Sequence, residues 1–162
     1  MKSNEKRKLI IVLTLLFVFT FSAISIGNLN FTAGFMRKNL KLSAVSDKIY
    51  ISGDSGWSNA KDTGICTGEG TSSIPYVIED LVIDGNGLGS CIWIENTDVY
   101  FKIENCTLYN SGGNWIDGGI SLVNVDNGQI TNNTARNNWR NGISLRYCEN
   151  NNISGNIVSI HT

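Results

Sequence analysis

Two tryptophans stand at matching places ahead of two similar segments of the sequence. Trp115 lies four residues before Gly119 and Trp139 three residues before Gly142, and each glycine opens a Gly-Ile-Ser-Leu segment. The apolar face of a sugar ring stacks well on an indole. If the two segments stack as strands about 4.8 Å apart, the indoles form a stepped platform for a carbohydrate. The alternative is that each tryptophan covers the end of a hydrophobic core.

Two charged residues accompany these tryptophans. Asp117 lies two residues before Gly119 and Arg140 two residues before Gly142, so opposite charges fall in register. An exposed ion pair is worth only about 0–1 kcal/mol, which favours a role in orienting ligand hydroxyl groups beside the indoles. The predicted ligand-binding residues are Trp115, Trp139, Asp117 and Arg140.

Residues for catalysis are harder to find. Inverting hydrolysis of a glycoside needs two carboxyl groups about 6.5–9.5 Å apart, and Asp98 and Asp126, 28 residues apart, fit the repeat register only loosely. A lyase needs a calcium-binding acidic cluster and a base, for which Arg136, Arg140 and Arg146 qualify only by residue type. We therefore assign no catalytic residue and interpret the chain as a non-catalytic surface module that binds glycans or partner proteins. A polysaccharide-active enzyme, lyase or glycoside hydrolase, or a fragment of one, is the alternative.

Metal ligands are scarce. The single His is His161 and the two Met are Met1 and Met36, so copper handling lacks the soft and imidazole ligands it needs. The cysteines, whose spacing matches no zinc pattern, are Cys66, Cys91, Cys106 and Cys148. Disulfide pairing and small apolar packing both stay open for them. We expect no metal and no cofactor.

An internal repeat predicts the elements that position these residues. It follows a short alternating segment, Ile49-Tyr50-Ile51, and an expected glycine-rich loop through Trp57 and Cys66. Spacings of 25, 27 and 23 residues are shared by three columns, namely Ile78, Ile103, Ile130, Ile153; Leu81, Cys106, Asn133, Asn156; and Ile83, Leu108, Ala135, Val158. A second strand aligns as Ile92, Ile120, Ile143 and as Ile94, Leu122, Leu145. We expect the isoleucines of the first column and of this second strand to point inward and to be almost fully buried. A unit of this length buries its apolar face only by stacking on a copy of itself.

The sequence predicts an all-β, right-handed parallel β-helix of about four coils over residues 47–162. An antiparallel sandwich does not explain the shared register, and the Leu-x-x-Leu-x-Leu consensus of leucine-rich repeats is absent.

Asparagines cluster at the expected corners of this repeat, where their tolerance of the left-handed conformation suits a sharp bend. We expect Asn133 and Asn156 to turn their amides inward or along the axis. The same region contains glycosylation sequons, and their candidate residues are Asn105, Asn132 and Asn152, with Asn30 further upstream. A structural role of the asparagines in the repeat and glycosylation explain the three sequons within the repeat equally well.

The N-terminus resembles an export signal. Four basic residues precede an apolar run from Leu9 to Phe21, and small residues follow at plausible cleavage positions. We interpret 1–27 as a signal peptide or a retained signal-anchor helix and 28–46 as a linker. Loss of the first 27 residues, which carry four basic residues and one acidic residue, moves the net charge from −1 to about −4. This balance argues against nucleic acid as a partner. We expect a secreted or membrane-anchored protein with the β-helix outside the cytoplasm.

Three segments carry a resemblance to a known family. Gly68-Glu69-Gly70-Thr71, then Pro75–Gly85, then Ile94–Phe101 resemble the opening coils of NosD-like right-handed β-helix proteins of the pectin-lyase-like superfamily. The resemblance implies a surface module associated with carbohydrate binding or sugar cleavage, with carbohydrate or cell-surface components as partners and membrane contact only through the N-terminus. Hydrolases of this superfamily carry several Asp, a His and an Arg-x-Lys; here only Asn96-Thr97-Asp98 matches. Because the chain ends partway round a coil, the sequence suggests a truncated β-helix.

Overall fold

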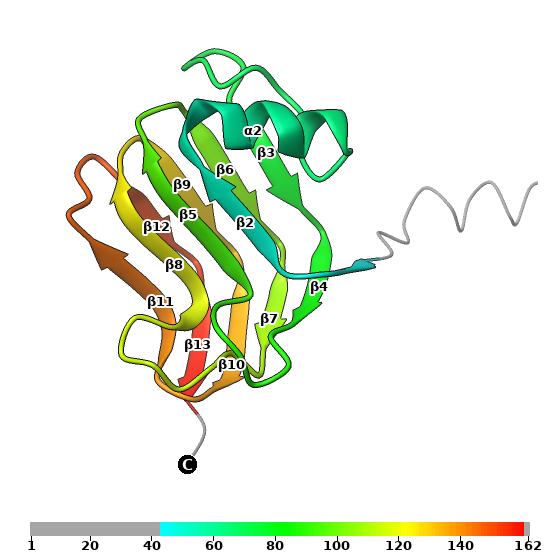
Figure 1. Cartoon of the computed structure of the whole chain (residues 1–162), viewed down its shortest axis with the longest axis vertical. Helices are drawn as coiled ribbons and strands as arrows, with labels where there is room; N and C mark the ends of the chain where they lie inside the picture. Colours follow the sequence, from blue (N-terminus) through cyan, green and yellow to red (C-terminus); the bar gives the residue numbers. More distant parts are fainter. Residues whose placement is uncertain (1–42, 161–162) are drawn as a thin grey trace, which may run out of the picture. The chain divides into compact units, whose positions relative to one another are not determined.

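Residues 43–160, the part that the computed structural model describes, form a parallel β-solenoid built from three sheets (Figure 1). The first sheet contains β2 (Ile49–Ser52), β5 (Ile92–Thr97), β8 (Gly118–Val125) and β11 (Asn141–Arg146). The second contains β3 (Tyr76–Glu79), β6 (Phe101–Glu104), β9 (Gly128–Thr131) and β12 (Asn152–Ser154). The third contains β1 (Ala44–Ser46), β4 (Leu81–Asp84), β7 (Thr107–Tyr109), β10 (Thr134–Asn138) and β13 (Ile157–Ile160).

Each turn of the chain contributes one strand to each sheet. Strands β5 to β7, β8 to β10 and β11 to β13 make three uninterrupted turns. A first turn, made by β2, β3 and β4, is interrupted by helix α2 (Gly53–Asp62) and the loop that follows it. The prediction of a β-helix is therefore confirmed, with three regular turns rather than four equivalent coils.

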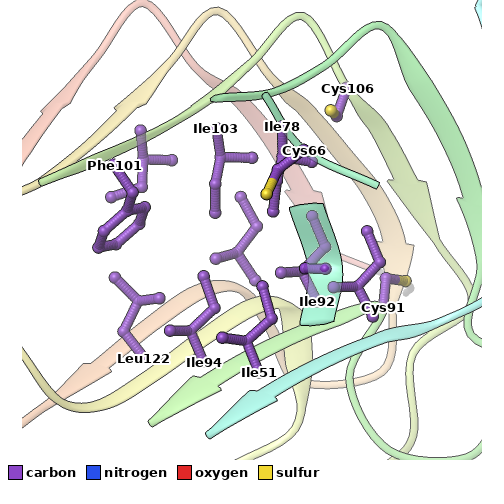
Figure 2. Close-up of a cluster of buried hydrophobic side chains, with 14 of the residues drawn as sticks. Ile51, Cys66, Ile78, Cys91, Ile92, Ile94, Phe101, Ile103, Cys106 and Leu122 are labelled. Carbon is purple, nitrogen blue, oxygen red and sulfur yellow. The ribbon is translucent and has the colours of Figure 1, made fainter. Parts of the chain in front are cut away.

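The repeat register is confirmed strand by strand. Ile78 pairs with Ile103, Ile103 with Ile130 and Ile130 with Ile153. The first sheet extends the column of Ile92, Ile120 and Ile143 backward to Ile49, a pairing that the sequence alignment missed. Figure 2 shows labelled side chains from different sheets, among them Ile94, Ile103 and Leu122, meeting in the interior.

The prediction that every column residue is almost fully buried is wrong for the last turn. Ile78, Ile103 and Ile130 are buried, but Ile153 is 45% exposed, and Ile143 is only half-buried. A central isoleucine has a turn on each side of it, whereas within residues 43–160 no further strand covers the outer edge of β12. Burial in a solenoid thus depends on position in the stack as well as on residue type.

Helix α2 occupies a segment for which the sequence indicated a glycine-rich loop. Its Trp57 and Ala60 are buried, and Trp57 stacks on Tyr76 with ring centroids 5.1 Å apart and an interplanar angle of 2°. The Phe101 ring also lies 5.1 Å from the indole. A ten-residue helix with two glycines depends on such tertiary packing for its stability. The helix packs on the first two turns, since it contacts β2 and β5.

The corners explain the abundance of asparagine. Asp80, Asn105, Asn132 and Gly155, spaced like the core columns, all have positive φ values between 55° and 66°. L-residues other than Asn, Asp and Gly rarely adopt this conformation. The prediction that Asn133 and Asn156 turn inward is confirmed as well. Asn133 Oδ1 accepts from Cys106 N at 2.9 Å, and its Nδ2 donates to Asn156 Oδ1 at 3.0 Å.

The cysteines favour the packing alternative. All four are free thiols, and Cys66, Cys91 and Cys106 are buried in the core. Burial raises the pKa of each of these three thiols to about 11.

Strand β1 lies within 28–46, the range interpreted as a linker, and pairs with β4 through Ala44 and Leu81. The predicted signal segment 1–27 lies outside the described residues.

Candidate glycan-binding face

The outer surface of the first sheet carries a two-row arrangement of side chains. Because strand residues alternate between faces, the residues between the buried isoleucines point away from the core. The strand pairing places them in two rows, which are Tyr50, Trp93, Ser121 and Ser144, followed by Ser52, Glu95, Val123 and Arg146. Three spacings of about 4.8 Å make this surface about 14 Å wide from β2 to β11.

Glu95 is the centre of a hydrogen-bond network at one end of these rows. Tyr50 Oη donates to Glu95 Oε1 at 2.5 Å, and Ser52 Oγ donates to the same oxygen at 3.1 Å. The other carboxylate oxygen accepts from Trp93 Nε1 at 2.9 Å. The hydrogen bond from Tyr50, with that from Trp93, lowers the pKa of Glu95, and the same Tyr50 contact raises the pKa of the phenol. The ionised form of the carboxylate is therefore stabilised by donors from two aromatic side chains.

A loop folds over the other end of the rows. Ser121 points outward yet is buried, because its Oγ donates to the Ile116 carbonyl at 2.8 Å and the loop lies across it. This loop presents Trp115, whose ring lies 4.1 Å below the Arg146 guanidinium. Trp115 is 62% exposed, so it does not cover the core. We define the aromatic face as Tyr50, Trp93, Glu95, Trp115 and Arg146.

An open acidic hollow of about 400 Å³ adjoins this face at the carboxyl ends of β5 and β8. Its lining residues are Asp54, Asn96, Thr97, Asp98, Asn124 and Asp126. Thr97 pairs with Val125, so Asp98 and Asp126 follow at equivalent places on adjacent turns. The view that their separation fits the register only loosely is therefore wrong, because Ile92 and Ile120 of the same sheet are also 28 residues apart.

The predicted pairing of Asp117 with Arg140 is not supported by the surroundings of the two side chains. The strand register is as expected, since Gly118 pairs with Asn141. Asp117, however, is only 4% exposed, and its Oδ2 accepts from the backbone N–H of Asn114 at 3.0 Å. The carboxylate therefore organises its own loop, whereas Arg140 is exposed beside the last turn.

Trp139 has a different set of neighbours from Trp115. It is also 62% exposed and lines a hollow of about 390 Å³ with Tyr109, Asn110 and Asn137. Both indoles are thus largely exposed to solvent, which rejects the alternative that they cover the end of the core. The stepped platform that would join them stays a prediction.

The sequon asparagines of the repeat, Asn105, Asn132 and Asn152, are all exposed, whereas Asn133 is buried in the ladder. Their glycosylation stays a prediction, and Asn30 lies outside the described residues. At Asn132 and Asn133 the structural role and the accessibility fall on neighbouring asparagines, because Asn132 at the corner is exposed and Asn133 is buried.

Sequence reasoning missed Tyr50, Ser52, Trp93 and Glu95. A signal was present, because Ile49-Tyr50-Ile51 and Ile92-Trp93-Ile94 share the pattern of an outward aromatic residue between two inward isoleucines. Aligning the two segments required a spacing of 43 residues, which the α2 insertion hides within a repeat of 23 to 28. Aromatic residues at equal strand positions pair across the sheet in the structure.

Residues 43–160 lack two further features. No cluster of three or more His, Cys, Asp or Glu side chains in this range is arranged to hold a metal ion. No helix in the same range has the length and apolarity needed to cross a membrane.

Comparisons with known proteins agree with the geometry. The family model described as "Right handed beta helix region" matches residues 27–160. No curated protein matches the chain, and no solved structure matches it either. The matched range spans most of the sequence and all of the described turns, so the chain belongs to the right-handed β-helix family.

Proposed function

We propose that this chain is an exported, non-catalytic β-helix module that binds glycans through the aromatic face. Within the proposal it is a NosD-like member of the pectin-lyase-like superfamily. The export signal expected at 1–27 supports an extracellular address. Glycans of the cell surface or its surroundings are the ligands, and partner proteins that carry such glycans are included.

The observation that carries this proposal is the Glu95 network with its two aromatic neighbours. Sugar recognition needs a flat apolar surface for the ring face and fixed polar groups for the hydroxyls. The Tyr50 ring is 66% exposed, and the Glu95 carboxylate has its position fixed by three side-chain donors. A group fixed in this way loses little conformational entropy when a ligand binds.

Trp115 and Arg146 supply the second half of the face. The cation over the indole is held at one place and offers guanidinium N–H donors that match hydroxyl or carboxylate oxygens. Since Tyr50 and Arg146 lie on the outermost strands of a four-stranded sheet, a ligand contacting both must cross the whole sheet. The face therefore suits an oligosaccharide rather than one sugar ring.

Affinity gel electrophoresis on a panel of neutral and acidic polysaccharides tests this function. At least one polysaccharide should retard the wild type, and Trp93→Ala and Trp115→Ala should each weaken retardation about tenfold, since truncating an aromatic side chain that carries binding energy costs more than about 1 kcal/mol and tenfold in affinity corresponds to about 1.4 kcal/mol. Tyr100→Ala, an exposed aromatic residue outside the face, is the control. Retardation that is equal in all variants, or absent on every polysaccharide, contradicts the proposal.

A second candidate function is polysaccharide cleavage in the acidic hollow. The adjacent-turn placement of Asp98 and Asp126 favours it, because hydrolysis of a glycoside uses two carboxyl groups on one face. Release of reducing ends, or absorbance from an unsaturated uronate, would identify the chain as an enzyme. The signal should then disappear in Asp98→Asn or Asp126→Asn. Retention of the polysaccharide without either signal favours the binding module.

A further inference from the structure

The third sheet ends in an irregularity that builds a second surface hollow. Its strand β10 pairs with β13 through Arg136 and Ser159 and then through Asn138 and Ile160, so one residue is inserted between the pairs. The inserted residue, Asn137, has a φ of 53°. Such a β-bulge changes the direction of side chains and is frequent beside functional sites.

The bulge directs two consecutive side chains outward. Ala135 and Asn138 are both fully buried, and Asn138 hydrogen-bonds inward to Ser111 N and the Leu108 carbonyl. Arg136 and Asn137, between them, are both exposed. A regular strand would have turned one of these two toward the core.

The walls of the resulting hollow combine aromatic rings with side-chain amides. It has a volume of about 390 Å³ and is lined by Tyr109, Asn110, Asn137 and Trp139. The Arg136 guanidinium lies 5.6 Å from the centre of the ring of Tyr109, one of these lining residues. This volume is near the lower end of the ~300–1,000 Å³ typical of small-molecule sites.

The amide of Asn110 is held in a fixed orientation. Its Nδ2 donates to Asp84 Oδ1 at 2.8 Å, and Asp84 is the strand partner of Tyr109. The carbonyl oxygen of the same amide is thereby left as an acceptor. Asn137 offers both a donor and an acceptor, and neighbouring sugar hydroxyls likewise donate and accept.

We propose that this hollow is a second carbohydrate site, which binds a single pyranose ring at a chain end or branch. Trp139 stacks on the ring face, and the amides of Asn110 and Asn137 bind vicinal hydroxyls. Arg136 adds a donor at the rim. The site lies on the third sheet, so it goes beyond the oligosaccharide-binding role of the aromatic face and stands without it.

Indole N–H signals in a ¹⁵N NMR spectrum test the site, because the chain has four tryptophans and one of them lines this hollow. The probes are methyl β-D-glucopyranoside, methyl β-D-galactopyranoside and methyl α-D-mannopyranoside. At least one should shift the Trp139 signal in a saturable manner. The buried Trp57 signal serves as the internal reference. A Trp139 signal that is unmoved by all three probes overturns the proposal.

Two variants separate binding from folding. Asn137→Gly retains a backbone that tolerates the positive φ while it removes the amide, and it should weaken the response of Trp139 at least tenfold. Tyr100→Ala should leave the response intact. An undiminished response in folded Asn137→Gly overturns the assignment of the amide.

The aromatic face is tested separately by Trp93→Ala, which should reduce oligosaccharide retention and leave the Trp139 response in place. If only the Trp139 response fails, the second site is wrong and the proposed function stands. If the wild type is not retained by any polysaccharide but the Trp139 signal responds, the proposed function of the aromatic face is wrong and the second site stands.

Discussion

The central turns and the last turn of this solenoid are built from the same residue types but differ in burial. Ile103 and Ile130 are completely enclosed, whereas Ile153, the next member of the column, is 45% exposed. At the other end, α2 places Trp57 against the first turn, where its indole stacks on the Tyr76 ring of β3. The hydrophobic contribution of a repeat is therefore set by its neighbours, so equivalent substitutions should have graded effects.

The largest expected effect is the loss of a central isoleucine. Ile103→Ala should lower the free energy of unfolding by about 2–5 kcal/mol, because it leaves a cavity between two covering turns. Ile153→Ala should cost less than about 1 kcal/mol, since much of its side chain already faces solvent. Urea unfolding followed by circular dichroism measures both. Equal losses would contradict the proposed difference between the turns.

The asparagine ladder gives the second comparison. Asn133→Ala removes the side-chain amide that pairs two backbone groups inside the stack. The Cys106 N–H loses its acceptor, and the Ile103 carbonyl loses the donor that the Asn133 amide supplies. Leaving such groups unpaired costs about 1–3 kcal/mol. Asn156→Ala should cost less, because water reaches the last turn. Hydrogen exchange at the Cys106 amide offers a local readout, and slow exchange retained in Asn133→Ala would argue against the ladder.

The smallest effect concerns the surface network around Glu95. Tyr50→Phe removes the strongest hydrogen bond to the carboxylate, so the lowered pKa of Glu95 should rise toward its ordinary value. A lowered folded-state pKa stabilises the protein above the unfolded-state pKa, and this contribution disappears as the pH falls through the lowered value. NMR titration of the Glu95 side-chain carbon measures the change. An unchanged or lower pKa in the variant would show that Tyr50 does not hold the carboxylate.

Much of the fold follows from the sequence because a solenoid repeats its burial pattern. The spacings of Ile78, Ile103 and Ile130 predicted both the register and the buried columns. Helix α2 did not follow, since its stability comes from Trp57 packing on residues far along the chain. Exposure in the last turn did not follow either, because column membership says nothing about which turns lie above and below.

The site was less predictable than the fold. Exposed Trp115 and Trp139 were found from their places before the Gly-Ile-Ser-Leu segments, and their surface positions are observed. Asp117 was misjudged, because a short polar side chain next to glycines can bind its own loop instead of facing a ligand. Glu95 was missed since its partners Tyr50 and Ser52 reach it only through strand pairing across the α2 insertion.

The most direct test of glycan binding by the aromatic face is an indole N–H titration of the wild type with oligosaccharides from the polysaccharide that retards it most. We predict that the Trp93 and Trp115 signals shift with the same dependence on ligand concentration and give one dissociation constant, while the buried Trp57 signal stays in place. Trp93 donates to Glu95 and Trp115 lies under Arg146, so the two signals report on both halves of the face. Binding that leaves both signals unmoved would contradict the account.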